Sequence, residues 1–488
     1  MSKACIVGAG IAGLASAIRL RRKGYEVAVY EANPYPGGKM HAETYQGYRF
    51  DLGPSLFTMP QLVEELFTLC GKDPKTHFPY LRKEVLCHYF WEDGTRFFAP
   101  ADTDTFAREA ARTFGEPESA IEAYLSRNAK KYDLTAPLFL EKSLHRPKTY
   151  LSYKTLKALA AAGGLGIFSS LDGVNRQAFR SPKLVQLFNR YATYNGSNPY
   201  QTPGIMSMIP HLEMALGTYY PQGGMHQIPM SLYQLALSEG VEFHFNCPVS
   251  RILTREGRAV GLQLADSEVA ADLVVSNMDI YPTYRRLLPD QKAPERTLSQ
   301  ERSSSALIFY WGISREFPDL DLHNIFFSSD YPGEFKKIFG EKALSEDPTV
   351  YINITSKESP GDAPPGCENW FVMINAPGDY GQDWEGLISQ ARKSILDKLG
   401  RNLGVSIEPA IEVEEVLSPG LIASRTSSHR GALYGAASND RFAAFLRHPN
   451  FTSRIRGLYF AGGSVHPGGG IPLCLLSARI VSDTVPAP

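Results

Sequence analysis

The chain has 488 residues, of which 43% are apolar and 21% charged, and its formal net charge is −1. This ordinary globular composition in so long a chain argues against a single core and predicts two domains. Nucleic acid is not an expected partner, because the chain has no basic tail and no recognised reader motif.

Targeting and metal signals are weak. Six cysteines form no C-x-x-C pair and have no histidines at zinc spacing, so reduced buried thiols and no metal site are expected. The first apolar run begins at residue 4, which leaves no room for a signal sequence, and cytoplasmic localisation is expected. No stretch reaches the roughly 18 uninterrupted apolar residues of a spanning helix.

A glycine-rich fingerprint opens the chain. An apolar run over residues 4–7 precedes the sequence GAGIAG at residues 8–13, and a helical run follows. This is the strand, turn and helix of a dinucleotide-binding unit. Gly8 permits the tight turn, Gly10 lets the backbone approach a pyrophosphate, and Gly13 lets the helix pack on the strand.

Two further features favour FAD over NAD. Glu31 ends the next apolar run eighteen residues after Gly13, close to the roughly 20-residue offset of a carboxylate that accepts from ribose hydroxyls. The same carboxylate would repel the extra phosphate of NADP. Gly37, Gly38 and Lys39 follow, where two glycines allow backbone approach and a cation can face the pyrophosphate.

Further along, the pattern alternates between two kinds of structure. It predicts a helix over residues 61–70, a hairpin of strands 85–91 and 96–99, a mostly helical insertion over 103–190, strands over 241–245 and 273–277 with a meander over 251–253 and 259–262 between them, strands over 307–311 and 350–354, a helix over 387–399, and a parallel strand over 458–462. The expected fold is α/β, with a Rossmann-like FAD-binding domain (βαβ, GxGxxG) interleaved with a mixed-sheet and helical domain that binds substrate and a membrane. The expected boundaries are 1–75, 220–290 and 425–488 for the first domain, and 76–219 and 291–424 for the second.

Positive charge is concentrated in the helical insertion. Residues 127–190 contain twelve Lys or Arg and three Asp or Glu, with apolar residues interleaved. Such a stretch suits an anionic membrane surface, and peripheral membrane association is the prediction. A solvated basic face on a helical domain explains the pattern equally well. Neutralising Lys130, Lys131, Lys154 and Lys157 would separate the two.

A second glycine-rich motif, HPGGGIP at residues 466–472, closes the chain. Pro472 suits the first turn of a helix over 473–481, because its missing N–H would have no partner there. Gly470 and Ile471 then present free amides to the negative charge that a reduced flavin carries near N1. His466 is the candidate catalytic residue because a histidine can titrate near neutral pH, and a structural histidine is the alternative.

These residues together resemble the carotenoid desaturases of the bacterial phytoene desaturase type, within the flavin amine oxidase superfamily. The most specific stretches are residues 49–55 (RFDLGPS), 191–196 (YATYNG), 199–200 (PY), 219–225 (YYPQGGM) and 466–472 (HPGGGIP). The resemblance covers nearly the whole chain. It implies non-covalent FAD, a two-domain fold, membrane association and removal of hydrogen from a long polyene, as a hydride to the flavin and a proton from the neighbouring carbon.

The resemblance also implies roles for individual residues. It assigns the pyrophosphate to Gly8, Gly10, Ala12 and Gly13, the adenosine ribose to Glu31, the length of the cofactor to Lys39, Pro54 and Ser55, the adenine to the backbone of Val249, and a further contact to Asn277. At Gly463 many relatives have an acidic residue facing the ribityl chain, so here that contact is expected from the backbone or not at all. Gly37, Gly38, Gly470, Ile471 and Pro472 complete the expected cofactor site.

The closing motif also indicates a class of carotenoid substrate. The ending GGSVHP at residues 462–467 resembles the branch that introduces a 3,4 double bond into 1-hydroxylated carotenoids more than the branch that acts on phytoene. Phytoene desaturation, redox-neutral carotenoid isomerisation, amine oxidation and a non-enzymatic flavin- or carotenoid-binding role remain alternatives. Residues 191–200 are the expected substrate wall, and oxygen or a quinone is the expected electron acceptor.

Overall fold

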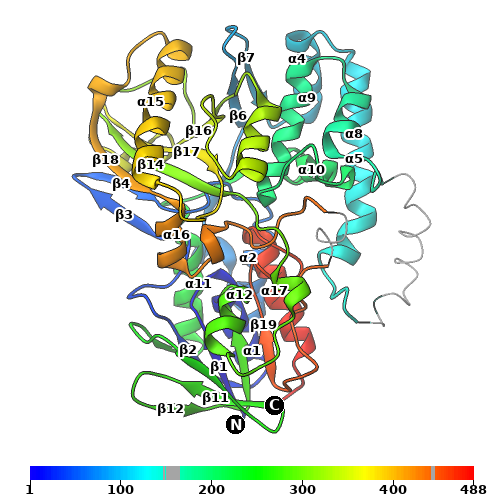
Figure 1. Ribbon diagram of the computed structural model, residues 1–488, viewed down its shortest axis with the longest axis vertical. Helices are drawn as coiled ribbons and strands as arrows, with labels where there is room; N and C mark the ends of the chain where they lie inside the picture. The colour runs from blue at the N-terminus through cyan, green and yellow to red at the C-terminus, as the bar shows by residue number, and fades with distance from the viewer. Residues whose placement is uncertain (147–148, 150–164, 441–445) are drawn as a thin grey trace.

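The computed structural model describes residues 1–146, 149, 165–440 and 446–488. Figure 1 shows two regions, one above the other: a small parallel sheet with its helices near the two chain termini, and a larger sheet beside a helical region. Loops from the upper region meet the helices of the lower one where α2, α16 and α17 lie.

The lower region is built on a parallel sheet of five strands. Its order is β19 (Leu458–Phe460), β13 (Leu273–Ser276), β1 (Lys3–Val7), β2 (Glu26–Tyr30) and β9 (Glu242–His244). All four pairings are parallel. Helix α1 (Ile11–Arg22) connects β1 to β2. The strands predicted around residues 4–7, 241–245, 273–277 and 458–462 are confirmed.

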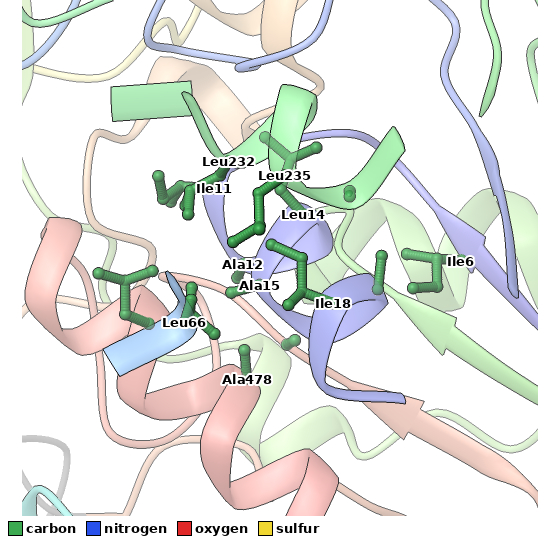
Figure 2. Close-up of a cluster of buried hydrophobic side chains, with 14 of the residues drawn as sticks. Ile6, Ile11, Ala12, Leu14, Ala15, Ile18, Leu66, Leu232, Leu235 and Ala478 are labelled. Atoms are coloured by element: carbon green, nitrogen blue, oxygen red, sulfur yellow. The ribbon is translucent and has the colours of Figure 1, made fainter. Parts of the chain in front are cut away.

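Helix α1 is the centre of the lower core. It is packed by α2 (Gln61–Leu69), α11 (Gln227–Ser238) and α17 (Ile471–Thr484), and Figure 2 shows side chains of these helices meeting around it. Every residue of α1 from Ile11 to Leu20 is buried, and burying one large aliphatic side chain contributes about 1.5–3 kcal/mol. The first and last long helices of the described chain therefore share one core.

The upper region is built on a sheet of seven strands. Its order is β18 (Ile411–Leu417), β14 (Ser305–Ile313), β17 (Glu368–Ala376), β16 (Val350–Ile354), β15 (His323–Phe326), β6 (Val85–Phe90) and β7 (Arg96–Pro100). Only the β15–β6 pairing is parallel. The predicted hairpin and strands are confirmed. Helix α15 (Trp384–Leu403) packs on one face, over Trp311 and Trp370.

The remaining helices and strands lie outside the two large sheets. The helical region contains α4 (Thr103–Phe114), α5 (Glu118–Phe139), α8 (Leu171–Ala178), α9 (Pro182–Asn189) and α10 (Ile209–Met214). Short helices elsewhere are α3 (Pro74–His77), α12 (Ile280–Pro282), α13 (Glu295–Leu298), α14 (Tyr331–Phe335) and α16 (Pro419–Thr426). Strands β10 (Arg251–Arg255), β11 (Arg258–Gln263) and β12 (Glu268–Ala270) form the predicted meander, and β3 (Ala42–Tyr45), β4 (Tyr48–Asp51), β5 (Tyr80–Arg82) and β8 (Tyr219–Pro221) form two pairs.

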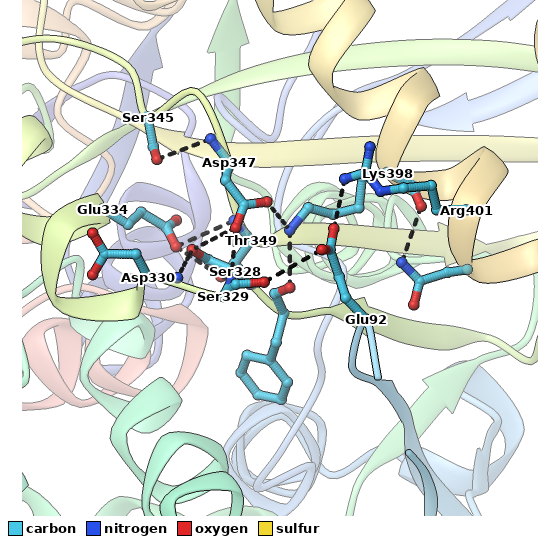
Figure 3. Close-up of polar contacts among 12 residues, drawn as sticks. Glu92, Ser328, Ser329, Asp330, Glu334, Ser345, Asp347, Thr349, Lys398 and Arg401 are labelled. Atoms are coloured by element: carbon cyan, nitrogen blue, oxygen red, sulfur yellow. Dashed lines mark hydrogen bonds and ion pairs between the residues drawn. The ribbon is translucent and has the colours of Figure 1, made fainter. Parts of the chain in front are cut away.

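A buried polar network joins α15 to the segments that flank α14 (Figure 3). The Lys398 ammonium donates to the Phe327 carbonyl at 2.9 Å and pairs with Asp347 at 2.5 Å. Glu334 accepts from the backbone and hydroxyl of Thr349, at 3.2 and 2.7 Å. Burial raises the pKa of Glu334 to about 7. This network therefore contains a carboxyl group that favours its neutral form.

The described part of the basic stretch contains both exposed and partly buried cations. Arg190 and Lys183 pair with Glu213 and Asp93, and Lys131 donates to the Ser207 hydroxyl at 2.9 Å. Burial lowers the pKa of Lys131 to about 8. The described cations of the stretch that are exposed are Arg127, Lys130, Lys142, Arg146, Arg176 and Arg180. Lys148, Lys154 and Lys157 lie outside the described residues. In the described ranges, no helix is both long and apolar enough to span a bilayer.

Candidate cofactor and substrate site

The opening glycine loop lies between β1 and α1, and side chains do not fit in it. A Cβ at Gly10 would lie 2.6 Å from the Asn277 Oδ1, and a Cβ at Gly13 would lie 2.1 Å from the Gly8 carbonyl oxygen. Within the described ranges, no side chain forms a capping hydrogen bond at the start of α1. The first backbone amides of the helix are therefore bordered by glycines and not by side chains. This is the arrangement that binds a phosphate.

The Gly-Gly-Lys turn lies directly on this loop. The Gly37 amide donates to the Ala9 carbonyl at 2.8 Å, and a Cβ at Gly38 would lie 3.4 Å from the Gly10 Cα. The two motifs that the sequence separates by more than twenty residues thus form one surface. That surface is the backbone cradle expected around the pyrophosphate.

Glu31 lies at the carboxyl edge of the parallel sheet, where ligands of such sheets bind. Its carboxylate is 6% exposed and accepts from the amides of Ala9 and Asn33 at 2.7 and 2.9 Å. The Cys247 amide donates to the Glu31 carbonyl at 2.8 Å, which brings the segment that leads to Val249 beside the same edge. The predicted ribose and adenine residues therefore lie next to each other.

Asn277 joins the opening motif to the closing one. Its Oδ1 lies against Gly10, and its Nδ2 donates to the Ala461 carbonyl at 2.9 Å. A Cβ at Gly462 would lie 2.8 Å from that Nδ2, and a Cβ at Gly463 would lie 3.2 Å from the Gly469 Cα. The residues predicted in the opening and closing motifs therefore lie around the same side chain, Asn277.

The start of α17 is open, as the closing motif predicts. Gly470 has a φ of +110°, which favours glycine, and a Cβ there would meet nothing within 4 Å. Pro472 lies in the first turn and no side chain caps the helix. The space in front of Gly470 and Ile471 is thus free for a negatively charged group.

Among the described residues, three cations have no carboxylate within 4 Å: Lys39, which follows Gly38 of the cradle, Arg447, which lies beside Gly468, and Arg302, which lies over the Tyr281 ring. Lys39 donates to the Ala432 carbonyl at 3.1 Å, and burial lowers its pKa. Arg447 donates to the Tyr434 carbonyl at 2.7 Å, and burial lowers its pKa to about 10. Two guanidinium nitrogens of Arg302 are buried with no hydrogen-bond partner in the part of the chain that the structure describes. Unpaired buried charge is costly, so this set fits the pyrophosphate of FAD.

The segment with Pro54 and Ser55 lies between the cradle and the upper sheet. A Cβ at Gly53 would lie 1.9 Å from the Lys39 carbonyl oxygen, so the segment passes tightly beside Lys39. Pro54 is exposed and Ser55 is half-buried. The Ser55 hydroxyl lies 2.7 Å from the Tyr351 hydroxyl of β16. This contact connects the expected cofactor residues to the large sheet.

His466 is deeply buried at 2% exposure. Its Nε2 lies 2.8 Å from the Lys142 carbonyl oxygen, and its ring stands edge-on to the His145 ring at 5.7 Å. Burial lowers the pKa of His466 to about 4. The near-neutral titration expected from the sequence is therefore wrong, because burial disfavours the imidazolium, and the ring is neutral at pH 7.

The expected substrate wall is partly a buried polar cluster. The Tyr191 hydroxyl donates to the Glu213 carboxylate at 2.9 Å, and the Tyr194 hydroxyl bonds to the same group. Arg190 donates to the Tyr89 hydroxyl at 2.7 Å. These hydroxyls already have partners, so any substrate contact from Tyr191 or Tyr194 comes from a ring surface.

Several site residues carry no sequence signal. Arg447 and Arg302 stand outside every motif. Tyr434 lies between two motifs in space: a Cβ built at Gly469 would lie 2.7 Å from the Tyr434 Cβ, and a Cβ built at Gly196 would lie 2.9 Å from the Tyr434 ring Cδ2. The residues that contact these three side chains are far from them in the sequence. No local pattern identifies them.

The chain belongs to the family of flavin containing amine oxidoreductases, which it matches over residues 11–486. It is 60% identical over 486 residues, 100% of this chain and 99% of the relative, to a 1-hydroxycarotenoid 3,4-desaturase from Flavobacterium sp. (strain P99-3). It is 34% identical over 492 residues, 99% of this chain and 97% of the relative, to a 4,4'-diapolycopene oxygenase from Methylomonas sp.

The fold is shared more widely than the sequence. A crystal structure of an oxidoreductase from Methanosarcina mazei superposes with a TM-score of 0.64 at 17% identity, covering 99% of this chain and 100% of that one. The mixed α/β class and the family resemblance expected from the sequence are thereby confirmed.

Proposed function

We propose that this protein is an FAD-dependent carotenoid desaturase that introduces the 3,4 double bond into 1-hydroxylated carotenoids. The observation that carries the proposal is the 60% identity, over the whole chain, to a desaturase of that name. The backbone cradle and the three cations without carboxylate partners support FAD as the cofactor. Family membership makes the protein an oxidoreductase.

We assign FAD to a Rossmann-like domain made of residues 1–75, 220–290 and 425–488. The assignment is supported by the five parallel strands, all of which fall within these ranges. The seven-stranded sheet and the helical region, within 76–219 and 291–424, form the substrate domain. The chain thus crosses between the two domains several times, and the proposed active site lies where they meet.

Bound FAD supplies a hydride acceptor for the polyene. The chain's own residues do the rest. Lys39, Arg302 and Arg447 offset the charge of the diphosphate, and the amides of Gly470 and Ile471 favour negative charge at the start of α17. No nucleophile is required, so orientation of the polyene in an apolar slot provides much of the rate.

We propose His466 as the proton acceptor. Loss of hydride leaves a delocalised cation whose neighbouring C–H is acidic, so a weak base is sufficient. Because the Lys142 carbonyl must accept, the His466 Nε2 carries the proton and Nδ1 is free to accept one. His466→Ala should lower turnover at unchanged flavin content, and intact turnover would exclude this role.

Membrane association is also part of the proposal, because a carotenoid substrate is held in lipid. The exposed cations Lys130, Lys142, Arg146 and Arg180 support contact with an anionic surface, and Phe168 is 76% exposed nearby in sequence. We propose oxygen or a quinone as the electron acceptor.

The function is tested with purified, FAD-loaded protein on liposomes that contain a 1-hydroxylated carotenoid. The expected product has lost two hydrogens and absorbs at longer wavelength, and the protein is yellow. Incorporation of oxygen would favour the second candidate, oxygenation, which the 34% identity to a named oxygenase raises. An unchanged mass would indicate isomerisation, conversion of phytoene alone would refute the branch assignment, and protein that stays colourless with added FAD would refute the cofactor.

A further inference from the structure

A chain of hydroxyl groups runs from the cofactor side into the large sheet. The Ser55 Oγ lies 2.7 Å from the Tyr351 hydroxyl, and that hydroxyl lies 2.8 Å from the His323 Nδ1. Ser55 and Tyr351 are half-buried, whereas His323 is 4% exposed. The proposed mechanism uses none of these three side chains in the chemistry.

The direction of the hydrogen bonds follows from the neighbours. The Asn353 Nδ2 faces the Leu322 carbonyl at 2.8 Å and the His323 Nδ1 at 3.3 Å, so this nitrogen donates to both. The His323 Nδ1 is therefore an acceptor, and its lone pair is shared by two donors, the Tyr351 hydroxyl at 2.8 Å and the Asn353 Nδ2 at 3.3 Å. Burial lowers the pKa of His323 to about 3, which keeps the ring neutral.

The outer end of this chain is consequently an acceptor. The Tyr351 hydroxyl already donates its one hydrogen bond to His323. At the 2.7 Å contact with Ser55, the Tyr351 oxygen therefore accepts and the Ser55 hydroxyl donates. Ser55 then presents oxygen lone pairs outward, and Tyr351 retains one further acceptor position. A partner at this place has to donate a hydrogen bond.

Two neighbours of Tyr351 in the sheet are apolar. On the sheet face, Tyr351 lies opposite Ile325 of β15 and Met373 of β17. Met373 is also half-buried. An apolar chain that carries an alcohol group matches two apolar side chains beside a hydroxyl acceptor.

We propose that Ser55 and Tyr351 bind the 1-hydroxyl group of the substrate and so set the preference for 1-hydroxylated carotenoids. The inference rests on the proposed function. The hydroxyl is attached at C1, two bonds from C3, and with C–C bonds of about 1.5 Å its oxygen lies within about 4 Å of C3. The group that recognises it must therefore lie beside the hydride acceptor, as Ser55 does in the proposed cofactor site.

The test compares three substrates on liposomes: a 1-hydroxylated carotenoid, the same polyene without the hydroxyl, and its 1-methoxy ether. FAD-loaded wild type should prefer the hydroxyl to the deoxy polyene by tenfold or more in kcat/KM, because a buried acceptor without a donor is penalised. The methoxy ether accepts but cannot donate, so it should be used no better than the deoxy polyene.

Ser55→Ala and Tyr351→Phe should each lower kcat/KM per bound flavin on the hydroxylated substrate about tenfold and shrink the preference for that substrate toward unity. Tyr220→Phe is the matched control, because Tyr220 forms a tyrosine–serine pair with a different serine, Ser359, at 3.1 Å. This control should keep the preference.

Equal losses on all three substrates in Ser55→Ala and Tyr351→Phe, or an unchanged preference, would overturn the assignment of the hydroxyl site. Good use of the methoxy ether by wild type would overturn the direction of the hydrogen bond. Wild type that desaturates none of the three would instead refute the proposed function, and the two failures are thus distinguishable.

Discussion

Gly10→Ala tests whether the opening glycine is needed for packing or for the cofactor. The added Cβ would lie 2.6 Å from the Asn277 Oδ1, inside the 3.0 Å that real Cβ atoms keep. Overpacking of this kind costs about 1–3 kcal/mol. Asn277 can move only by giving up its 2.9 Å bond to the Ala461 carbonyl, which contributes about 1 kcal/mol.

Asn277→Ala removes the atom with which the new methyl collides. In that background, Gly10→Ala should cost little further stability, measured by thermal unfolding of the apoprotein. The methyl still occupies the place expected for the pyrophosphate, so FAD affinity should fall about tenfold or more in both backgrounds, the equivalent of at least about 1.4 kcal/mol. Titration with FAD and flavin fluorescence measures this term separately from stability.

The outcome that refutes this reasoning is specific. If the double variant binds FAD as tightly as Asn277→Ala alone, Gly10 serves only to pack against Asn277, and the cradle is assigned to the wrong ligand. A destabilised double variant with normal FAD affinity would lead to the same conclusion.

Three further predictions concern charged residues. Glu31→Ala should weaken FAD by about 1.5–3 kcal/mol in a flavin titration, because a charged hydrogen bond to ribose is lost, and unchanged affinity would contradict the ribose assignment. Because the folded pKa of Glu334 is raised to about 7 from 4.5, its stability contribution is present below about pH 4.5 and is lost as the pH rises through 7. Glu334→Gln should therefore gain about 3 kcal/mol relative to wild type between pH 4 and 8 in urea unfolding, whereas parallel curves would refute the shift. Lys130→Gln should weaken binding to anionic liposomes several-fold at low salt while Lys131→Gln, whose ammonium contacts Ser207, should not; equal effects would contradict the proposed surface.

Local signals predicted most of the lower region. The glycine spacing at residues 8–13 and the apolar runs at 4–7 and 458–462 depend only on neighbours in sequence, and the structure places them as expected. Glycines at positions with no room for a Cβ are the clearest signal in the sequence, because no other residue fits there.

The residues that complete the site could not be predicted in the same way. Arg302 and Arg447 are 145 positions apart in the sequence. Each stands out only in the folded structure, where no described carboxylate pairs with its guanidinium group. In the basic stretch, charge counted along the chain does not distinguish the exposed cations from those that turn inward. Arg190 belongs to a buried ion pair, and no periodicity distinguishes it from its exposed neighbours.

The packing of α17 on α1 has a consequence for biosynthesis. The proposed flavin site combines Gly10, before α1, with Gly470, before α17, so a nascent chain in which α17 has not yet been made holds only part of this site. Cofactor loading must therefore wait until α17 has emerged and docked. Until then the apolar surface of α1 has no lasting cover, which makes this interval the period of greatest exposure to aggregation and proteolysis.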